Sequence, residues 1–380
     1  MTAVRVMFIF RHGGRRAIAQ SWQQRPQALQ RSYASKIDIP YPRGSTIPTI
    51  EACPIPTCQC QETPSGLDIE REQNINGSMA AYAEQVLIST GKSDWTSKIE
   101  DEEDGVLVKR LKSFLGPKGK YSDPYHNVML TNSSFAPTNL PTAQRETPRE
   151  PPADNRSVPA AKSGSNDPSD VHDAEPASAF LLPSFQYVPT IPTDPASVEA
   201  LIKGYIQPSQ LHQSHDRLSR ADKNVLLRQS EMQRRFVGSR KIDEILVLIC
   251  GHGGRDVRCG TLGPILQREF EEKIERQNIP LLREAPVAEA ETVDTDAEGY
   301  SPSARVGLIS HIGGHKWAGN VIIYIPPSFS GNALAGKGIW YGRVAPEHVE
   351  GIVAKTILDG KVIKELFRGG VGQDREIVRL

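Results

Sequence analysis

Two cysteines and two histidines in the C-terminal half are the residues whose types and spacing could do chemistry. Cys250 and Cys259 lie nine positions apart in "ICGHGGRDVRCG", and His311 and His315 flank two glycines in "SHIGGHKWAGN". Thiolate and imidazole donors suit zinc as well as iron, so the four side chains could complete one metal site. Because glycine permits close backbone approach, we expect the first loop to wrap a bulky centre.

Other chemistries compete for the two thiols. A cysteine phosphatase places its arginine one position later than Arg255, where this chain has Asp256, so that reaction is discounted. A redox dithiol of thioredoxin type prefers Cys-x-x-Cys; the wider spacing here is less suitable, although a disulfide is geometrically possible. Structural zinc held by two cysteines and two histidines stays open, because zinc accepts the same donors.

The elements around these residues predict a small α/β sandwich of thioredoxin type. The strand-like "KIDEILVLI" ends directly at Cys250, and "LGPILQREFEEKIERQ" follows as an amphipathic helix. Three further strands, "ARVGLIS", "NVIIYIP" and "GIWYGRV", precede a second helix, "APEHVEGIVAKTIL". The order strand, helix, strand, strand, strand, helix suits that fold.

The preceding segment predicts a second, degenerate copy of the same fold. It contains the strand patterns "YAEQVLIST", "HNVMLTNSS" and "SAFLLPSFQYV" and the helix patterns "DGVLVKRLKSFLG" and "DPASVEALIKGYI". "EQVLISTGKSDW" and "DEILVLICGHGGRD" both run from a strand into a Gly-containing loop, which places Ser89 opposite Cys250. This similarity suggests a duplicated fold in which only the second copy kept its ligands; the alternative is a coincidence of two ordinary strand-loop-helix units.

The N-terminus predicts mitochondrial targeting. Residues 1–33 contain six arginines and no Asp or Glu, and "RSYAS" resembles a matrix-peptidase site that would start the mature chain near Ala34. We expect the matrix rather than the intermembrane space. Oxidised thiols would suit the intermembrane space better; the candidates for a redox role are Cys53, Cys58 and Cys60 in "EACPIPTCQCQ".

Composition limits the remaining classes. The formal net charge is zero, so no global positive field calls for nucleic acid, and no apolar stretch reaches the roughly 20 residues of a membrane span. The predicted organisation is a transit peptide at 1–33, a Pro/Cys-containing lead-in at 34–78, an N-terminal α/β domain at 79–206 with a disordered insertion at 136–179, a linker at 207–240, the thioredoxin-like domain at 241–370 and a tail at 371–380.

Four motifs together resemble the sucrase/ferredoxin-like family. "CGHGGRDVRCG", "HIGGHKWAGN", "WYGRV" and "LFRGG" occur in order between about Lys241 and Gly370. The resemblance implies that the C-terminal domain is a thioredoxin-like ferredoxin and that a 2Fe-2S cluster is bound by Cys250, Cys259, His311 and His315. The residues expected to surround the ligands without binding the cluster are His252, Arg255, Asp256 and Arg258.

The expected function is one-electron transfer or redox sensing and quality control in mitochondria, with an unidentified redox partner protein. Replacing two thiolates by neutral imidazoles lowers the negative charge at the cluster, so its potential should exceed that of an all-cysteine ferredoxin. The alternative is a non-redox binding or structural module with a Cys2His2 zinc site. Turnover of a small molecule is not expected, and no carboxylate pair argues for glycoside chemistry.

Overall fold

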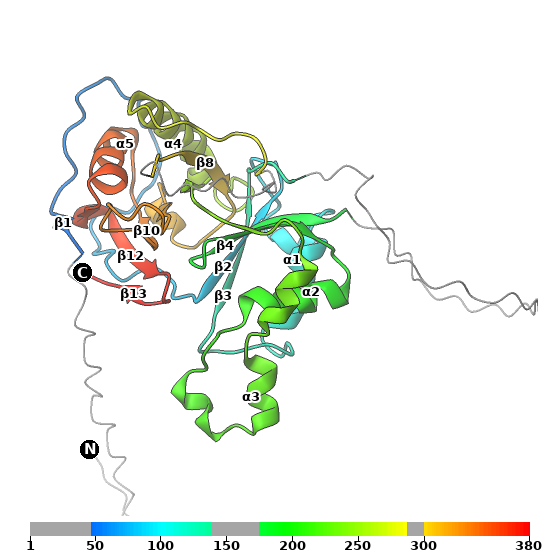
Figure 1. Ribbon diagram of the computed structural model, residues 1–380. Helices are drawn as coiled ribbons and strands as arrows, with labels where there is room; N and C mark the ends of the chain where they lie inside the picture. The colour runs from blue at the N-terminus through cyan, green and yellow to red at the C-terminus, as the bar shows by residue number, and fades with distance from the viewer. Residues whose placement is uncertain (1–46, 139–174, 287–299) are drawn as a thin grey trace, which may run out of the picture. The chain divides into compact units, whose positions relative to one another are not determined.

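Eleven strands of the described residues form one continuous mixed sheet (Figure 1). The computed structural model describes residues 47–138, 175–286 and 300–380. The transit peptide predicted at 1–33 and most of the insertion predicted at 136–179 therefore lie outside the described residues.

The C-terminal half has the predicted thioredoxin-like order. Strand β7 is parallel to β8 and antiparallel to β9, and β9 is antiparallel to β10. The elements are β7 (Ile245–Cys250), α4 (Val257–Arg276), β8 (Ala304–Ile309), β9 (Val321–Ile325), β10 (Lys337–Tyr341), α5 (Pro346–Ile352), β11 (Val362–Ile363), β12 (Phe367–Gly372) and β13 (Ile377–Val378). Alternate side chains of β7 enter hydrophobic clusters on opposite faces of the sheet, so this central strand is buried on both sides.

The N-terminal half repeats this arrangement. Strand β2 is parallel to β3 and antiparallel to β4, which is antiparallel to β5. The elements are β2 (Glu84–Ser89), α1 (Val106–Leu115), β3 (Val128–Ser133), β4 (Ala177–Leu182), β5 (Gln186–Ile191) and α2 (Pro195–Leu201). In both halves the last helix passes into a π-helical segment, at Ile202–Ile206 and at Val353–Leu358. The prediction of two thioredoxin-like copies is confirmed.

The two copies share one sheet because their edge strands meet. β3 pairs with β8 in an antiparallel sense at Ser133 and Ile309, the last residues of the two strands. Ser89 ends β2 as Cys250 ends β7, so the two occupy equivalent positions in the repeat. The C-terminal ends of both parallel strand pairs thus converge where the copies join.

Some predicted elements differ from the observed ones. "SAFLLPSFQYV" is not one strand but the hairpin of β4 and β5, because Pro183 lacks an N–H and Phe185 adopts a positive φ of 51° at the turn. β4 begins at Ala177, inside the predicted insertion. The predicted tail at 371–380 contributes to the sheet, since β12 runs to Gly372 and pairs with β13.

The lead-in segment packs on the C-terminal half, although the N-terminal half is closer to it in sequence. β1 (Thr49–Ile50) pairs with β11, and the backbone and hydroxyl of Thr57 both donate to the Glu350 carboxylate of α5. The blue segment in Figure 1 accordingly runs past α5 and α4. Residues 47–78 thus belong structurally to the C-terminal half.

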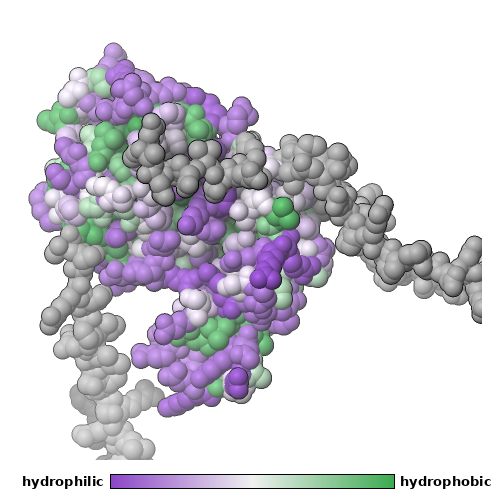
Figure 2. Space-filling view, in the orientation of Figure 1, coloured by the Kyte–Doolittle hydropathy of each residue, from purple (hydrophilic) through white to green (hydrophobic). Residues whose placement is uncertain are grey.

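The predicted linker contains short helices and a strand. α3 (Arg220–Leu226) buries none of its side chains, and β6 (Arg240–Lys241) adds to the edge at β5. The face shown in Figure 2 is mostly hydrophilic, with small separated apolar patches. Among the helices within the described ranges, none is long and apolar enough to cross a membrane.

Candidate metal centre

The two predicted thiol ligands lie together at the C-terminal end of β7. Cys250 ends this strand and Cys259 is the third residue of α4; each is 1% exposed and both are free thiols. The pKa of Cys250 is held well below its usual range, first because the Cys259 thiol donates to its sulfur, and also by contacts with His311 and the His252 backbone. The same contact raises the pKa of Cys259.

The two predicted imidazole ligands lie in the loop after β8. The rings of His311 and His315 have centroids 5.4 Å apart, and Gly313 and Gly314 between them adopt left-handed φ values of 82° and 77°. Glycine takes these dihedrals without strain, so the loop can turn both imidazoles toward one region. His311 contacts the Cys250 sulfur. His311 is half-buried and His315 exposed, which makes the histidine side of the site the solvent-facing side.

Cys250 contacts both Cys259 and His311, and the His315 ring lies 5.4 Å from the His311 ring, but the four side chains do not form a ready single-ion site. Within the described ranges, no three His, Cys, Asp or Glu side chains form a group that could hold a metal ion. Nδ1 of His311, however, is buried and has no hydrogen-bond partner, which is unusual for an imidazole nitrogen unless a ligand satisfies it. A dinuclear cluster spreads its ligands over two irons and does not require all four donors around one point. The donor set and the unpaired nitrogen fit such a cluster.

His252 supports the histidine loop through hydrogen bonds and is not placed as a ligand. It is 1% exposed, and its Nδ1 accepts the backbone N–H of His311 at 3.0 Å. Its Nε2 lies 2.9 Å from the Thr96 carbonyl oxygen. Because Nδ1 accepts and Nε2 must donate, the ring is the neutral Nε2–H tautomer, with both nitrogens engaged.

The three charged residues of the loop steady its two ends. Asp256 is the N-cap of α4, accepting from the Arg258 backbone at 3.0 Å, and its carboxylate pairs with the Arg258 guanidinium at 2.8 Å. Arg258 also donates to the Asp68 carbonyl of the lead-in at 2.9 Å. Arg255 is exposed and donates to Ser97 of the N-terminal half at 3.2 Å.

One glycine of the cysteine loop, Gly254, contacts the N-terminal copy. A Cβ on Gly254 would collide with the Trp95 carbonyl oxygen, and its N–H donates to the Asp94 carboxylate at 3.1 Å. The Gly91–Ser97 loop of the degenerate copy therefore occupies the space beside Gly254. The lack of bulk at this glycine serves the contact between the two copies.

The three N-terminal cysteines contact α5 and the lead-in itself. Cys53 Sγ lies 3.4 Å from the His348 carbonyl oxygen, Cys58 Sγ lies 3.1 Å from Glu350 Oε2, and Cys60 Sγ lies 3.5 Å from the Cys58 carbonyl oxygen. All three are free thiols, and burial raises the pKa of Cys53 to about 12. Their redox role stays a prediction.

Sequence reasoning did not identify Arg368 and Asn320, which pack beneath the histidine loop. Arg368 Nη1 donates to the Gly313 carbonyl oxygen at 3.2 Å and to Asn320 Oδ1 at 2.6 Å, and Asn320 donates to the Gly314 carbonyl oxygen at 3.0 Å. The available signal was an arginine inside the apolar stretch of "LFRGG".

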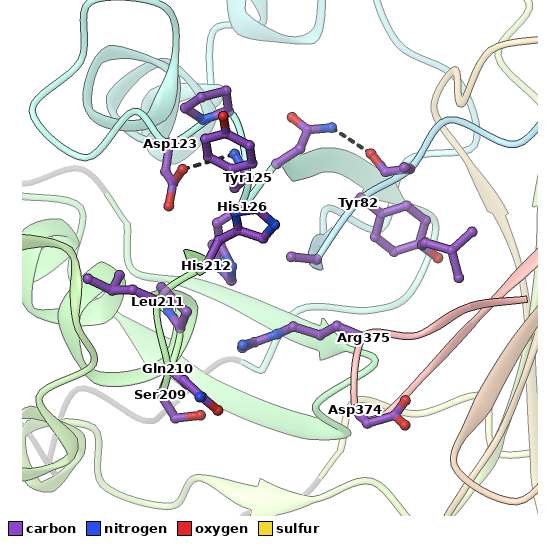
Figure 3. Close-up of a pocket in the computed structure, with 16 residues that line it drawn as sticks. Tyr82, Asp123, Tyr125, His126, Ser209, Gln210, Leu211, His212, Asp374 and Arg375 are labelled. Atoms are coloured by element: carbon purple, nitrogen blue, oxygen red, sulfur yellow. Dashed lines mark hydrogen bonds between the residues drawn. The ribbon is translucent and has the colours of Figure 1, made fainter. Parts of the chain in front are cut away.

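A separate cavity of about 450 Å³ lies where four segments that are distant in sequence meet (Figure 3). Arg375, whose φ is 68°, extends into it from the C-terminal segment, opposite a stack of Tyr125 on His212 with ring centroids 4.4 Å apart. None of the four predicted ligands lines this cavity. The cavity and the candidate metal centre are therefore distinct sites.

Comparisons with known proteins identify the family. The sucrase/ferredoxin-like family model matches residues 75–369. Altered inheritance of mitochondria protein 32 from Debaryomyces hansenii is 29% identical over 331 residues, covering 85% of this chain and 96% of that protein. Proteins of the same name from Meyerozyma guilliermondii and Clavispora lusitaniae are 42% and 44% identical over 130 and 131 residues, each match covering 34% of this chain and 36% of the relative.

No solved structure matches the chain. The family match nevertheless spans both thioredoxin-like copies and all four predicted ligands, from before β2 to β12. The chain belongs to the sucrase/ferredoxin-like family.

Proposed function

We propose that this chain is a mitochondrial 2Fe-2S protein that acts in one-electron transfer or redox sensing and quality control. The observation that carries the proposal is the buried Nδ1 of His311, which has no partner and lies in a loop beside two free thiols in mutual contact. Cys250, Cys259, His311 and His315 would hold the cluster. When bound, such a cluster supplies a single-electron redox couple.

The positions of the ligands suit this role, because the two cysteines are buried and the histidines lie on the solvent-facing side. The cysteines are nearly inaccessible, which protects thiolates from oxidants and alkylating agents. The exposed His315 brings the ligand set to the surface, where a redox partner protein can approach. His252 fixes the backbone of His311 from within the protein.

The proposal includes a location in the mitochondrial matrix. It is supported by the arginine-rich, acid-free residues 1–33, which lie outside the described ranges, and by the name of the relatives, which refers to inheritance of mitochondria.

The decisive experiment is a visible absorption spectrum of anaerobically purified protein, with iron, acid-labile sulfide and zinc measured on the same sample. A coloured protein with two irons and two sulfides per chain is the expected result. Colourless protein with stoichiometric zinc would replace the proposal by a structural Cys2His2 site.

A further inference from the structure

Arg368 is a buried cation whose contacts are all neutral. Its side chain is among the largest fully enclosed ones, and the residue is 2% exposed. Nε donates to Ser78 Oγ at 3.1 Å, Nη2 to the Ser78 carbonyl oxygen at 3.2 Å, and Nη1 to Asn320 and Gly313. Across the described residues, no carboxylate lies within ion-pair distance of it. A buried charge without a counter-charge is strongly destabilising, so a negative charge nearby is expected.

The candidates for that negative charge are the two thiols of the candidate metal centre, which are the acidic groups that act on the Arg368 charge. Burial lowers the pKa of Arg368 to about 10, while Cys250 and Cys259 oppose this shift, so the guanidinium stays charged at neutral pH. A Cβ on Gly314 would lie 2.7 Å from Nη2, so the turn between the two histidines rests directly on the guanidinium. The guanidinium also lies over the rings of Trp317 and Trp340, 5.2 and 5.6 Å from their centroids.

We propose that Arg368 is the counter-charge of the cysteine-histidine site and that it raises the reduction potential of the site. The proposal rests on the proposed 2Fe-2S function. An electron delivered by a reduced partner protein adds one negative charge to the site, with no bond formed or broken. A fixed cation at low local dielectric stabilises that added charge far more than an exposed arginine does.

A purely bracing role must be separated from the electrostatic one. Arg368→Lys keeps the positive charge and loses the planar fork that contacts Ser78, Gly313 and Asn320. Arg368→Gln removes the charge and retains a polar side chain. Asn320→Asp leaves Arg368 in place and adds a carboxylate where Nη1 now donates at 2.6 Å, which neutralises the charge without deleting it. Arg379→Gln is the matched control, because it removes an exposed arginine that lies outside the cysteine and histidine loops.

The measurement is a spectroscopic redox titration of the full-length protein and these four variants at one pH and ionic strength. We expect Arg368→Gln and Asn320→Asp each to reduce the equilibrium constant for electron uptake at least tenfold, a drop of about 59 mV or more. Arg368→Lys should keep most of the wild-type potential, and Arg379→Gln should match wild type.

Wild-type potentials in coloured Arg368→Gln and Asn320→Asp would overturn the proposal and leave the 2Fe-2S function standing. If Arg368→Gln fails to fold or to retain iron, Asn320→Asp alone decides, and its unchanged potential overturns the inference. An Arg368→Lys potential as low as that of Arg368→Gln would assign the effect to bracing and likewise overturn it. Colourless wild-type protein would instead remove the proposed function on which the inference rests.

Discussion

Replacing Glu84 by glutamine should change how the stability of this protein depends on pH. Glu84 begins β2 and is 1% exposed. Oε1 accepts from Ser184 at 2.5 Å, Oε2 has no hydrogen-bond partner, and the Arg375 guanidinium is 3.8 Å away. Burial raises the pKa of Glu84 to about 7, and Ser184, Arg375 and Arg228 only partly oppose this.

The direction in which stability changes with pH follows from which state binds the proton of Glu84. Between pH 4.5 and about 7 the folded state holds a proton that the unfolded state has released, so stability falls as pH rises through this window. The pKa of Glu84 differs by about 2.5 units between the folded and unfolded states, which corresponds to about 3 kcal/mol of the free energy of unfolding. About 2.5 kcal/mol of this stabilisation is lost between pH 5 and pH 8. Glutamine keeps the shape and the Ser184 contact but cannot ionise. Glu84→Gln should therefore gain stability relative to wild type as the pH rises.

The assay is urea unfolding of wild type, Glu84→Gln and the exposed control Glu103→Gln at pH 5 and pH 8, followed by tryptophan fluorescence. The stability difference between Glu84→Gln and wild type should move in favour of the variant by about 2.5 kcal/mol from pH 5 to pH 8, and Glu103→Gln should show no such change. An equal difference at both pH values would refute the reasoning that Glu84 is buried with its proton.

Three further outcomes are expected. Cys250→Ser and Cys259→Ser should each lose most bound iron and sulfide, and full retention in both would remove these thiols from the ligand set. His252→Leu leaves the His311 N–H and the Thr96 carbonyl unpaired, so it should lower stability by about 1–3 kcal/mol for each buried group in thermal unfolding; a wild-type Tm would contradict the assigned hydrogen bonds. Residues 1–33 fused to a fluorescent reporter should enter mitochondria, and a diffuse cytosolic signal would reject this.

The elements that could be predicted were the strands and helices that have a clear pattern in a short stretch of sequence. "KIDEILVLI" and "YAEQVLIST" contain short apolar runs that suit a strand buried on both faces, and these runs form most of β7 and β2. The Pro-Ser-Phe turn inside "SAFLLPSFQYV" was missed because apolar residues flank it on both sides and conceal the break. α4 begins at Val257, before the expected Leu262, because Asp256 caps the helix despite the glycines that follow.

The candidate site was predictable in its donors and not in their surroundings. Cysteine and histidine are common metal ligands, and their position in glycine-rich segments distinguishes these four from the other residues of the sequence. Arg368 is one basic residue in a strand, and its partners come from two separate segments, Ser78 from the lead-in and Gly313 and Asn320 from the connection between β8 and β9. Contacts of this kind depend on the three-dimensional path of the chain, which no local pattern records.

The path of the lead-in implies an order of events during biosynthesis. Residues 47–78 leave the ribosome early, yet the Cys53 backbone bonds to Glu365, a residue 312 positions later in the chain. Domains generally fold as they emerge, N-terminal first, whereas this segment has no docking surface until the last helix and strands exist. Its three thiols consequently stay accessible throughout synthesis and are covered last. Docking of residues 47–78 is thus a closing step of maturation, and protease resistance of this segment reports a completed C-terminal half.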